Sequence, residues 1–237
     1  MGRVIVAGAG RMTVPSADVL ASDLTIGSTV KLMEGGTATE YLVVNQGIPS
    51  NNSNLYNSSC NGTWLLRKDI HSKRAWDSGS GDDAYKTSTI NTWLNGDFFN
   101  SLGSIEPSTI KQVQIPYYSL SLGNPIFKLT CKVFLLGGYE MGWTNSKTHY
   151  LPVDGACLSY FNGTALTDSK RIAYLNNSAT VWWLRSLNTN NHSSVWSVGT
   201  TGGTYATEFR TELIGVRPAL ILPSTAKFDA ATMLLKE

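Results

Sequence analysis

Two apolar segments near the C-terminus most strongly limit what this chain can fold into. They enclose residues 187–214, which are rich in Asn, Ser, Thr and Gly and carry scattered aromatic side chains. Apolar runs bounded by turn-forming residues are typical of buried strands. We therefore predict two core strands that hold the sheet geometry, with a polar surface segment between them. The two segments are Trp182-Trp183-Leu184-Arg185-Ser186 and Gly215-Val216-Arg217-Pro218-Ala219-Leu220.

The composition favours a protein with many turns. Charged residues make up 15 % of the 237 residues, against about 25 % in typical globular proteins. Asn, Ser, Thr and Gly stand in their place and satisfy backbone groups in loops, which favours an all-β or α+β fold. A net charge of +2 without a basic run predicts no nucleic-acid partner. The chain has no apolar run long enough to span a bilayer, so we expect no membrane insertion.

Alternation of apolar and polar residues predicts most of the strands. The clearest example is a hairpin in which Glu34-Gly35-Gly36 forms the turn. A second hairpin is predicted around Gly202-Gly203. Pro218 lacks a backbone donor, so its strand should lie at a sheet edge or carry a bulge. The predicted strands are 24–32, 40–44, 64–68, 115–118, 132–136, 181–185, 195–198, 204–209 and 214–222.

Helical spacing of apolar residues appears mainly within 82–102. Ile90, Leu94 and Phe98 recur at intervals of four, with Trp93 and Phe99 beside them. Ser88 or Thr89 is a suitable N-cap, and Gly96 weakens the middle. Pro107 at the start of 107–113 predicts a second, short helix.

Residues 1–21 are predicted to be an attachment arm and linker, followed by a single domain over 22–237. Arg3-Val4-Ile5-Val6-Ala7 favours a short strand, and Gly8-Ala9-Gly10 ends it. A dinucleotide fingerprint would need a third glycine where Thr13 stands, so that interpretation fails. A lone strand cannot fold by itself, so we expect it to pair with a partner chain or another copy.

Several motifs in this order resemble a family of uncharacterised domains common in gut bacteria and their phages. The resemblance covers residues 22 to 225, and departs from the family pattern at Leu187, where Pro is common. The motifs are the two segments above, Leu65-Leu66-Arg67-Lys68-Asp69 before Trp76, Ile90-x-x-Trp93-Leu94-Asn95-Gly96, and Val133-Phe134-Leu135-Leu136.

This resemblance implies an α+β, C-type-lectin-like fold with short antiparallel sheets, one main helix plus a short second helix, and long loops. Phage members resemble tail or other virion proteins, and some are targets of diversity-generating retroelements that rewrite adenines in a C-terminal repeat. The Asn, Ser, Thr and Tyr content of 188–211 agrees with such diversification and equally with ordinary polar turns.

The C-type-lectin-like fold also supports enzymes and calcium-dependent sugar binders, but the residues of this chain give little support for either activity. Formylglycine-generating enzymes need a reactive cysteine pair, but Cys131 and Cys157 stand in apolar contexts. Calcium-dependent sugar binders need an acidic-Pro-Asn loop, and here Glu106-Pro107-Ser108 stands. The carboxylates of 77–83 lack calcium-loop spacing, and no His or Cys pair has zinc spacing. We therefore expect no enzyme activity, no metal site and no cofactor.

The segment of about 186–212 is predicted to be a variable ligand-binding surface. Tyr and Trp offer contact area at low entropy cost, while Ser and Asn offer adaptable hydrogen bonds. Val195, Val198 and Phe209 match apolar scaffold positions, and imperfect alternation predicts a bulge. The alternative for Trp196 and Tyr205 is that they pack on the sheet. The candidate ligand-binding residues are Asn188, Asn190, Asn191, His192, Ser194, Trp196, Tyr205, Thr207, Glu208 and Arg210.

Together these features predict a phage virion receptor-binding protein of tail or fibre type. Its expected partners are a host cell-surface protein or glycan, other virion proteins through the N-terminal arm, and further copies of itself, with a trimer favoured. It would be made in the bacterial cytoplasm and reside on the particle surface. The alternatives are a structural virion protein, for capsid decoration or tail assembly, and more remotely an enzyme on the same fold.

Overall fold

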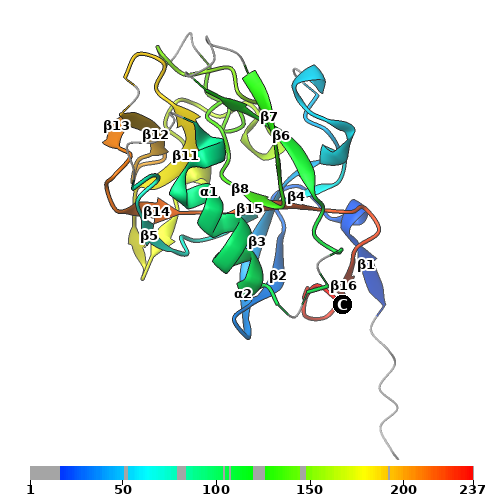
Figure 1. Ribbon diagram of the computed structural model, residues 1–237. Coiled ribbons are helices and arrows are strands. Elements are labelled where there is room, and N and C mark those ends of the chain that lie inside the picture. The colour runs from blue at the N-terminus through cyan, green and yellow to red at the C-terminus, as the bar shows by residue number, and fades with distance from the viewer. Residues whose placement is uncertain are drawn as a thin grey trace, which may run out of the picture.

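The computed structural model describes residues 17–50, 53–78, 84–103, 105–106, 108–119, 126–144, 148–191 and 193–236 (Figure 1). Within these ranges the protein is a mixed α+β fold rich in strands. Small antiparallel and mixed sheets accompany one helix of more than a single turn. The predicted α+β class and the predicted short sheets are therefore confirmed. Trp64, Trp76, Trp143, Trp182 and Trp183 are fully buried and form much of the core.

The first five-stranded sheet is antiparallel throughout. The turn at Gly35 and Gly36, both with positive φ, joins its first two strands as predicted. The side chains of Trp64, Leu65 and Leu66 are all buried, so the central strand is covered on both faces. Its strands, in sheet order, are β2 (Thr29–Glu34), β3 (Thr37–Gln46), β4 (Thr63–Arg67), β15 (Ala219–Leu222) and β8 (Val133–Phe134).

The second five-stranded sheet is mixed, because β11 and β14 run parallel. The predicted hairpin is confirmed as β12 and β13. Val195 pairs with Glu208 and Ser197 pairs with Tyr205, so the predicted bulge lies between these pairs. Its strands, in sheet order, are β13 (Thr204–Phe209), β12 (Ser194–Val198), β11 (Trp182–Leu187), β14 (Ile214–Val216) and β5 (Ser72–Arg74).

The predicted strand 214–222 is in fact two strands in two different sheets. Strand β14 belongs to the second sheet, and β15 lies between β4 and β8 in the first. Arg217 and Pro218 stand between them. Proline has no backbone N–H for a ladder, so pairing stops there and the chain crosses from one sheet to the other. The expectation of an edge strand or a bulge at Pro218 was therefore wrong. The missing backbone N–H of Pro218 instead ends the pairing of one strand before the next strand begins in the other sheet.

The main helix runs over 89–101 in three consecutive parts: α1 (Thr89–Trp93), the π-helical turn η5 (Leu94–Phe98) and α2 (Phe99–Ser101). Ser88 caps it, because its side chain accepts from the Asn91 N–H. Ile90, Leu94 and Phe98 are buried, as their spacing predicts. Gly96 does not end the helix, since the chain continues through the π turn.

The predicted second helix at 107–113 is wrong. Residues 108–110 form a turn in which the Thr109 N–H donates to Glu106 O, and Val113 already begins a strand. Pro107 lies outside the described residues. Strand β6 (Val113–Tyr118) pairs with β7 (Ile126–Cys131) to form a ribbon. The apolar run 132–136 contributes only β8.

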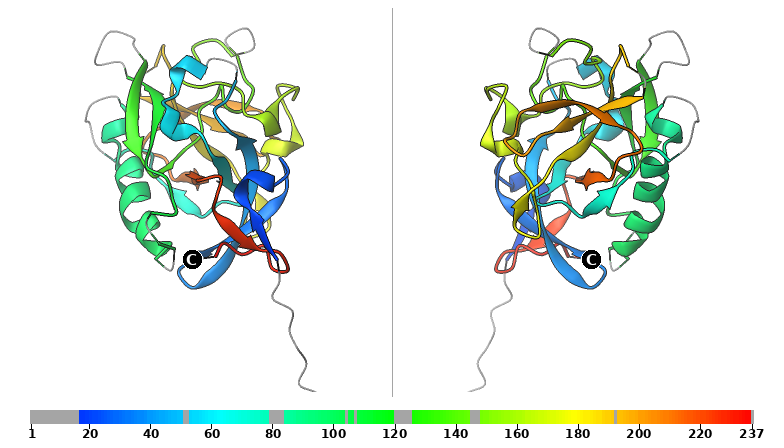
Figure 2. Two further views of the ribbon diagram at one scale, coloured as in Figure 1. Left: turned by 90° about the vertical axis from the view of Figure 1, so that its right-hand side faces the viewer. Right: turned by 90° about the vertical axis from the view of Figure 1, so that its left-hand side faces the viewer.

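Figure 2 shows the helix and the β6–β7 ribbon along one side of the molecule. The remaining elements are short. No helix in the described ranges has the length and apolar character needed to cross a bilayer. The elements are the 3₁₀ turns η1 (Ala21–Asp23), η2 (Ser53–Leu55), η3 (Ser58–Cys60), η4 (Tyr85–Thr87), η6 (Ser159–Phe161) and η7 (Ser169–Arg171), and the hairpin β9 (Tyr174–Leu175) with β10 (Ser178–Ala179).

Both ends of the described chain meet in one small ribbon. Strand β1 (Asp18–Leu20) pairs with β16 (Lys227–Asp229), and the tail bonds to Lys31 through Met233 O and the Leu235 N–H. Residues 18–20 of the predicted arm are thus part of the folded domain. The predicted strand at 3–7 lies outside the described residues.

Candidate functional site

Strand β11 is the best-buried strand next to the predicted binding surface. All six of its side chains are buried. Trp182 Nε1 donates to Arg171 O at 3.0 Å, and Trp183 Nε1 donates to Arg74 O at 2.8 Å. Each buried indole N–H thus has a partner, which buried polar groups require. The expectation that these residues hold the sheet geometry agrees with their burial and contacts.

Arg185 of β11 lies at the centre of a buried hydrogen-bond network. Its two terminal nitrogens donate to the two carboxylate oxygens of Glu140, both at 2.6 Å. It also donates to Pro116 O at 2.8 Å, Leu135 O at 2.9 Å and Asp154 O at 2.6 Å. One side chain therefore fixes β6, the end of β8 and the loop at 154 against β11.

The electrostatics of this pair follow from its burial. Both side chains have no exposed surface. Burial acts to lower the pKa of Arg185, and the Glu140 carboxylate more than offsets it, so the net pKa is raised. The planar guanidinium is suited to such two-pronged contact with a carboxylate.

Asp154 and Ser186 extend the network, as does Tyr56 on the other side of Glu140. Ser186 Oγ donates to the Asp154 carboxylate and accepts from the Gly138 N–H at 2.9 Å. Tyr56 Oη donates to Glu140 Oε1 at 2.8 Å. Burial raises the pKa of Asp154 to about 6, although Arg185 and Ser186 act against it. We call Tyr56, Glu140, Asp154, Arg185 and Ser186 the Arg185 centre.

The Arg185 centre orders loops rather than meeting a ligand. Arg185, Ser186, Glu140 and Asp154 are 0 % exposed, so a molecule in solvent does not reach them. Sequence reasoning missed Glu140, Asp154 and Tyr56. The available signal is weak: Glu140 stands alone among apolar and glycine residues in Gly137-Gly138-Tyr139-Glu140-Met141. A lone carboxylate in such a run needs a buried partner.

The loop after β11 contains the first predicted binding residues, and the structure divides them. Asn190 and Asn191 are exposed, as expected. Asn188 is buried, which corrects the expectation of exposure. Its Oδ1 accepts from the backbone N–H of Asn190 at 2.9 Å and of Asn191 at 3.2 Å, so it shapes the loop from within. His192 lies outside the described residues.

Two further predicted positions, Ser194 and Trp196, are also buried rather than displayed. Strand β12 lies between β11 and β13, and all five of its side chains are buried. Alternation therefore fails to separate an exposed face from a buried one, because both faces of the strand are covered. Val195 and Val198 are buried as predicted.

Strand β13 is the edge strand and carries the exposed side chains of the hairpin. Tyr205 is 49 % exposed, as predicted, whereas Phe209 is 56 % exposed and was expected to face inward. The bulge between the Ser197–Tyr205 and Val195–Glu208 pairs shifts the alternation of side chains along β13, so the spacing of Phe209 in the sequence does not predict the face that it takes. Arg210 is half-buried. Thr207 and Glu208 belong to β13, and their side chains lie outside the description.

Tyr150 joins this surface from a distant segment and was missed in the sequence. Its side chain is 54 % exposed, and its φ is +66°, uncommon for a non-glycine residue. Its carbonyl accepts from the Thr189 N–H at 3.0 Å and from Trp196 Nε1 at 3.3 Å. The buried Trp196 thus holds Tyr150 in place. We call the exposed side chains Tyr150, Asn190, Asn191, Tyr205 and Phe209 the display region.

The cysteines, His71 and the carboxylates are the groups that could support catalysis or metal binding. Burial raises the pKa of Cys60, Cys131 and Cys157, to about 12 for Cys131, which disfavours the reactive thiolate. His71 packs against Trp93 and Phe98, and burial lowers its pKa. Among the described residues no group of three His, Cys, Asp or Glu is arranged to hold a metal ion. Asp82 and Asp83 of the acidic segment fall outside that set.

The fold and this surface define a β-rich α+β domain with a buried ion pair and an exposed hairpin edge. Residues 61–224 match the model of a family described as a domain of unknown function (DUF6273). The match covers more than two thirds of the chain, so the protein belongs to this family. It includes the Arg185 centre except Tyr56, and all of the display region. Comparisons with curated proteins and with solved structures give no match.

Proposed function

We propose that the protein is a phage virion protein of tail or fibre type, with a C-type-lectin-like fold, that binds a host-surface protein or glycan. The observation that carries the proposal is the position of the display region. Exposed tyrosine, asparagine and phenylalanine side chains stand on backbone that a fully buried strand and a buried ion pair hold in place. Rigid presentation of such side chains lowers the entropy cost of binding.

The positions of the chain ends support attachment at one end and display at the other. Strand β1 pairs with β16, so the described part of the chain begins beside the C-terminal strand. Figures 1 and 2 place this ribbon at the opposite end of the molecule from the β12–β13 hairpin. An anchor in residues 1–16 would therefore leave the display region facing away from the particle.

Because the side chains of β12 are buried, the test of this proposal must leave them unchanged. Replacing all of 188–211 would remove buried side chains and unfold the domain, so only exposed positions are changed. The test variant combines Tyr150→Ser, Asn190→Ala, Asn191→Ala, Tyr205→Ser and Phe209→Ser. The control combines Leu166→Ser and Tyr174→Ser, which are exposed apolar positions outside the display region.

The measurement is binding of the labelled full-length protein to a panel of gut bacterial cells. We expect the test variant to lose at least tenfold in binding, while the control and the thermal midpoints of both stay near those of the parent. Equal binding by the test variant and the parent would refute the display region as the site. If the parent binds no cell but assembles into particles, a structural virion role replaces the proposal.

Diversification can be tested from DNA. A retroelement target would have a nearby near-copy of the segment that encodes 182–220, differing at adenines. We expect the differences to fall at exposed positions such as Asn190, Asn191 and Tyr205, and to spare Ser194–Val198, whose side chains are buried. Differences spread evenly over buried and exposed codons would contradict the assignment of this surface.

A further inference from the structure

Strand β5 (Ser72–Arg74) is an outer strand of the second five-stranded sheet and pairs with β14. The Gly215 N–H of β14 donates to Val181 O at 3.0 Å, so the backbone groups of Gly215 face away from β5. Gly215 stands opposite Lys73 in the antiparallel register. Bonded and unbonded pairs alternate in such a ladder, so the backbone N–H and C=O of Lys73 point outward. Lys73 is exposed, and this edge is therefore open to a further strand.

Two hollows flank the open edge of β5. One has a volume of about 320 Å³ and lies on the side of the main helix, with Arg74 and Trp93 in its lining. The other has a volume of about 240 Å³ and lies on the side of the β9–β10 hairpin, with Ala179 in its lining. Lys73 and the exposed Leu213 line both. Since side chains alternate between the faces of a strand, a strand added here would direct successive side chains toward the two hollows.

Both charged residues at this edge are cations without an acidic partner. Lys73 and Arg74 are exposed, and no carboxylate of the described residues forms an ion pair with either. The Arg74 guanidinium lies 3.9 Å from the centre of the Trp93 ring, and this contact restrains its plane while its N–H groups stay available. A guanidinium can bind a carboxylate through two parallel hydrogen bonds. The edge therefore favours a partner with acidic side chains.

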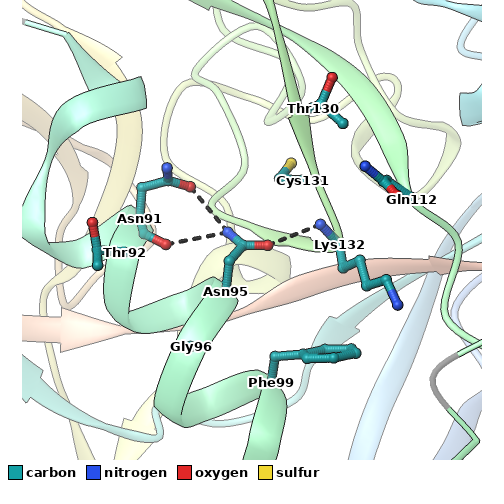
Figure 3. A pocket seen from close by; sticks show the side chains of 9 residues that line it. All are labelled: Asn91, Thr92, Asn95, Gly96, Phe99, Gln112, Thr130, Cys131 and Lys132. Carbon is teal, nitrogen blue, oxygen red and sulfur yellow. Dashed lines mark hydrogen bonds between the residues drawn. The ribbon is translucent and has the colours of Figure 1, made fainter.

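The larger groove, between the main helix and the β6–β7 ribbon, differs because its central polar side chain already has partners on both walls (Figure 3). Asn95 Nδ2 donates to Asn91 Oδ1 at 3.1 Å and to Val133 O at 2.9 Å. Asn95 Oδ1 accepts from the Lys132 N–H at 2.9 Å. These bonds join the helix to the ribbon, so the amide of Asn95 stabilises the fold. The edge of β5 instead presents cations that no described residue neutralises.

We propose that the open edge of β5 binds an extended acidic segment of a partner protein, which is added to the second sheet as a further strand. The partner's backbone accepts from the Lys73 N–H and donates to the Lys73 C=O. A carboxylate opposite Lys73 pairs with its ammonium, and a carboxylate one position along pairs with Arg74 on the other face. Strand β13 of the display region is the opposite edge of this sheet, so the proposal does not depend on the proposed function.

The probe for the test is a fluorescein-labelled peptide, Thr-Val-Glu-Glu-Val-Thr with blocked ends, and the measurement is its anisotropy with the full-length protein. One comparison peptide has Gln in place of both Glu residues. The other keeps the carboxylates but carries a methyl group on the backbone nitrogen of both Glu residues, which prevents strand pairing. We expect each change to weaken binding at least tenfold. Equal binding of the N-methylated peptide, or tighter binding of polyphosphate, would show attraction by charge alone and overturn the proposal.

Variants of the protein locate the site. Lys73→Gln and Arg74→Gln should each weaken peptide binding about fivefold, the upper range for a surface ion pair, and together at least tenfold. The matched control is Lys128→Gln, because Lys128 is exposed on a different sheet. Unchanged binding by the double variant overturns the proposal.

Lys73→Pro removes the outward N–H. Proline is tolerated on an edge strand where the N–H faces solvent, so circular dichroism should show a folded protein that binds the peptide at least tenfold more weakly. A folded Lys73→Pro variant that binds no more weakly than Lys73→Gln would contradict backbone pairing. If Lys73→Pro does not fold, its N–H is needed inside the protein, and the edge is not open as proposed.

Discussion

Strand β11 contributes Arg185 and Ser186 to the buried Arg185 centre, and the loop that follows this strand carries exposed asparagines. In the Arg185 centre each charged group has a single arrangement, because it is cut off from water and depends on its partners. In the display region the side chains meet solvent, and the backbone beneath them holds their positions. We therefore expect substitutions in the Arg185 centre to destabilise the fold, and substitutions in the display region, close by in the sequence, to leave it stable. The following predictions test that contrast, from the largest effect to the smallest.

Glu140→Gln should destabilise the protein most. It leaves the Arg185 guanidinium buried without a counter-charge, and breaking such a pair costs about 3–5 kcal/mol. The matched control is Glu40→Gln, since Glu40 pairs with Lys68 at the surface and such pairs contribute about 0–1 kcal/mol. Urea denaturation measures the free energy of unfolding of both variants. Similar losses of stability would show that the buried Glu140–Arg185 pair contributes no more than a surface pair.

Trp196→Ala and Tyr205→Ala compare two aromatic residues of the same hairpin. Trp196 is 3 % exposed, and its removal should cost about 3–5 kcal/mol through lost burial and a cavity. Tyr205 is half-exposed, so its loss should change stability by less than about 1 kcal/mol. Thermal unfolding followed by circular dichroism measures both. A larger loss for Tyr205→Ala would reverse the assignment of buried and displayed positions.

Asp154 should make stability depend on pH in an unusual direction. Its pKa is raised from 3.8 to about 6, so the folded protein holds this proton more tightly than the unfolded chain. The stabilisation is complete below pH 3.8 and is lost as the pH rises through 6. The shift corresponds to about 3 kcal/mol as an upper value.

The variant Asp154→Asn removes this titration. The stability of the variant relative to the parent should therefore rise between pH 4 and pH 7, by up to the same ~3 kcal/mol. Urea denaturation at four pH values in this interval measures the difference. A difference that stays constant with pH would show that Asp154 does not titrate there.

Asn188→Ala and Asn190→Ala compare a buried and an exposed asparagine of the same loop. Asn188 accepts two backbone hydrogen bonds inside the loop, so its loss should cost about 1 kcal/mol. Asn190 is exposed, and its loss should leave stability unchanged within about 0.5 kcal/mol. Chemical denaturation distinguishes the two. Equal effects would place Asn188 in the display region after all.

Local patterns in the sequence predicted most of the elements. The helix follows from Ile90, Leu94 and Phe98, whose spacing alone puts them on one face. The hairpins follow from glycines that allow their turns, and the bulge follows from the broken alternation in 204–209. These features depend on neighbours within a few residues, so they can be read without knowing what packs against them.

The wrong predictions of burial and exposure share one physical cause. Ser194, Trp196 and Asn188 are polar or amphipathic residues next to turns, yet they are buried. Strand β12 lies between two other strands, and the distant Tyr150 bonds to Trp196 and to the loop at Thr189. Phe209 is apolar, yet it is exposed because it lies after the bulge on an edge strand. Burial depends on what covers both faces of a strand, and local pattern does not contain that information.

Local sequence patterns were enough to predict an α+β, strand-rich domain with a buried strand at 181–185 and a hairpin after it. Which charges meet depends on how the chain packs in three dimensions. Arg185 finds Glu140 45 positions away, and Asn95 finds the backbone at Val133 38 positions away. This packing also decides that Pro218 carries the chain from one sheet to the other. Such contacts form because a buried charge or amide must be paired, and the partner is whichever group the fold brings within hydrogen-bond distance.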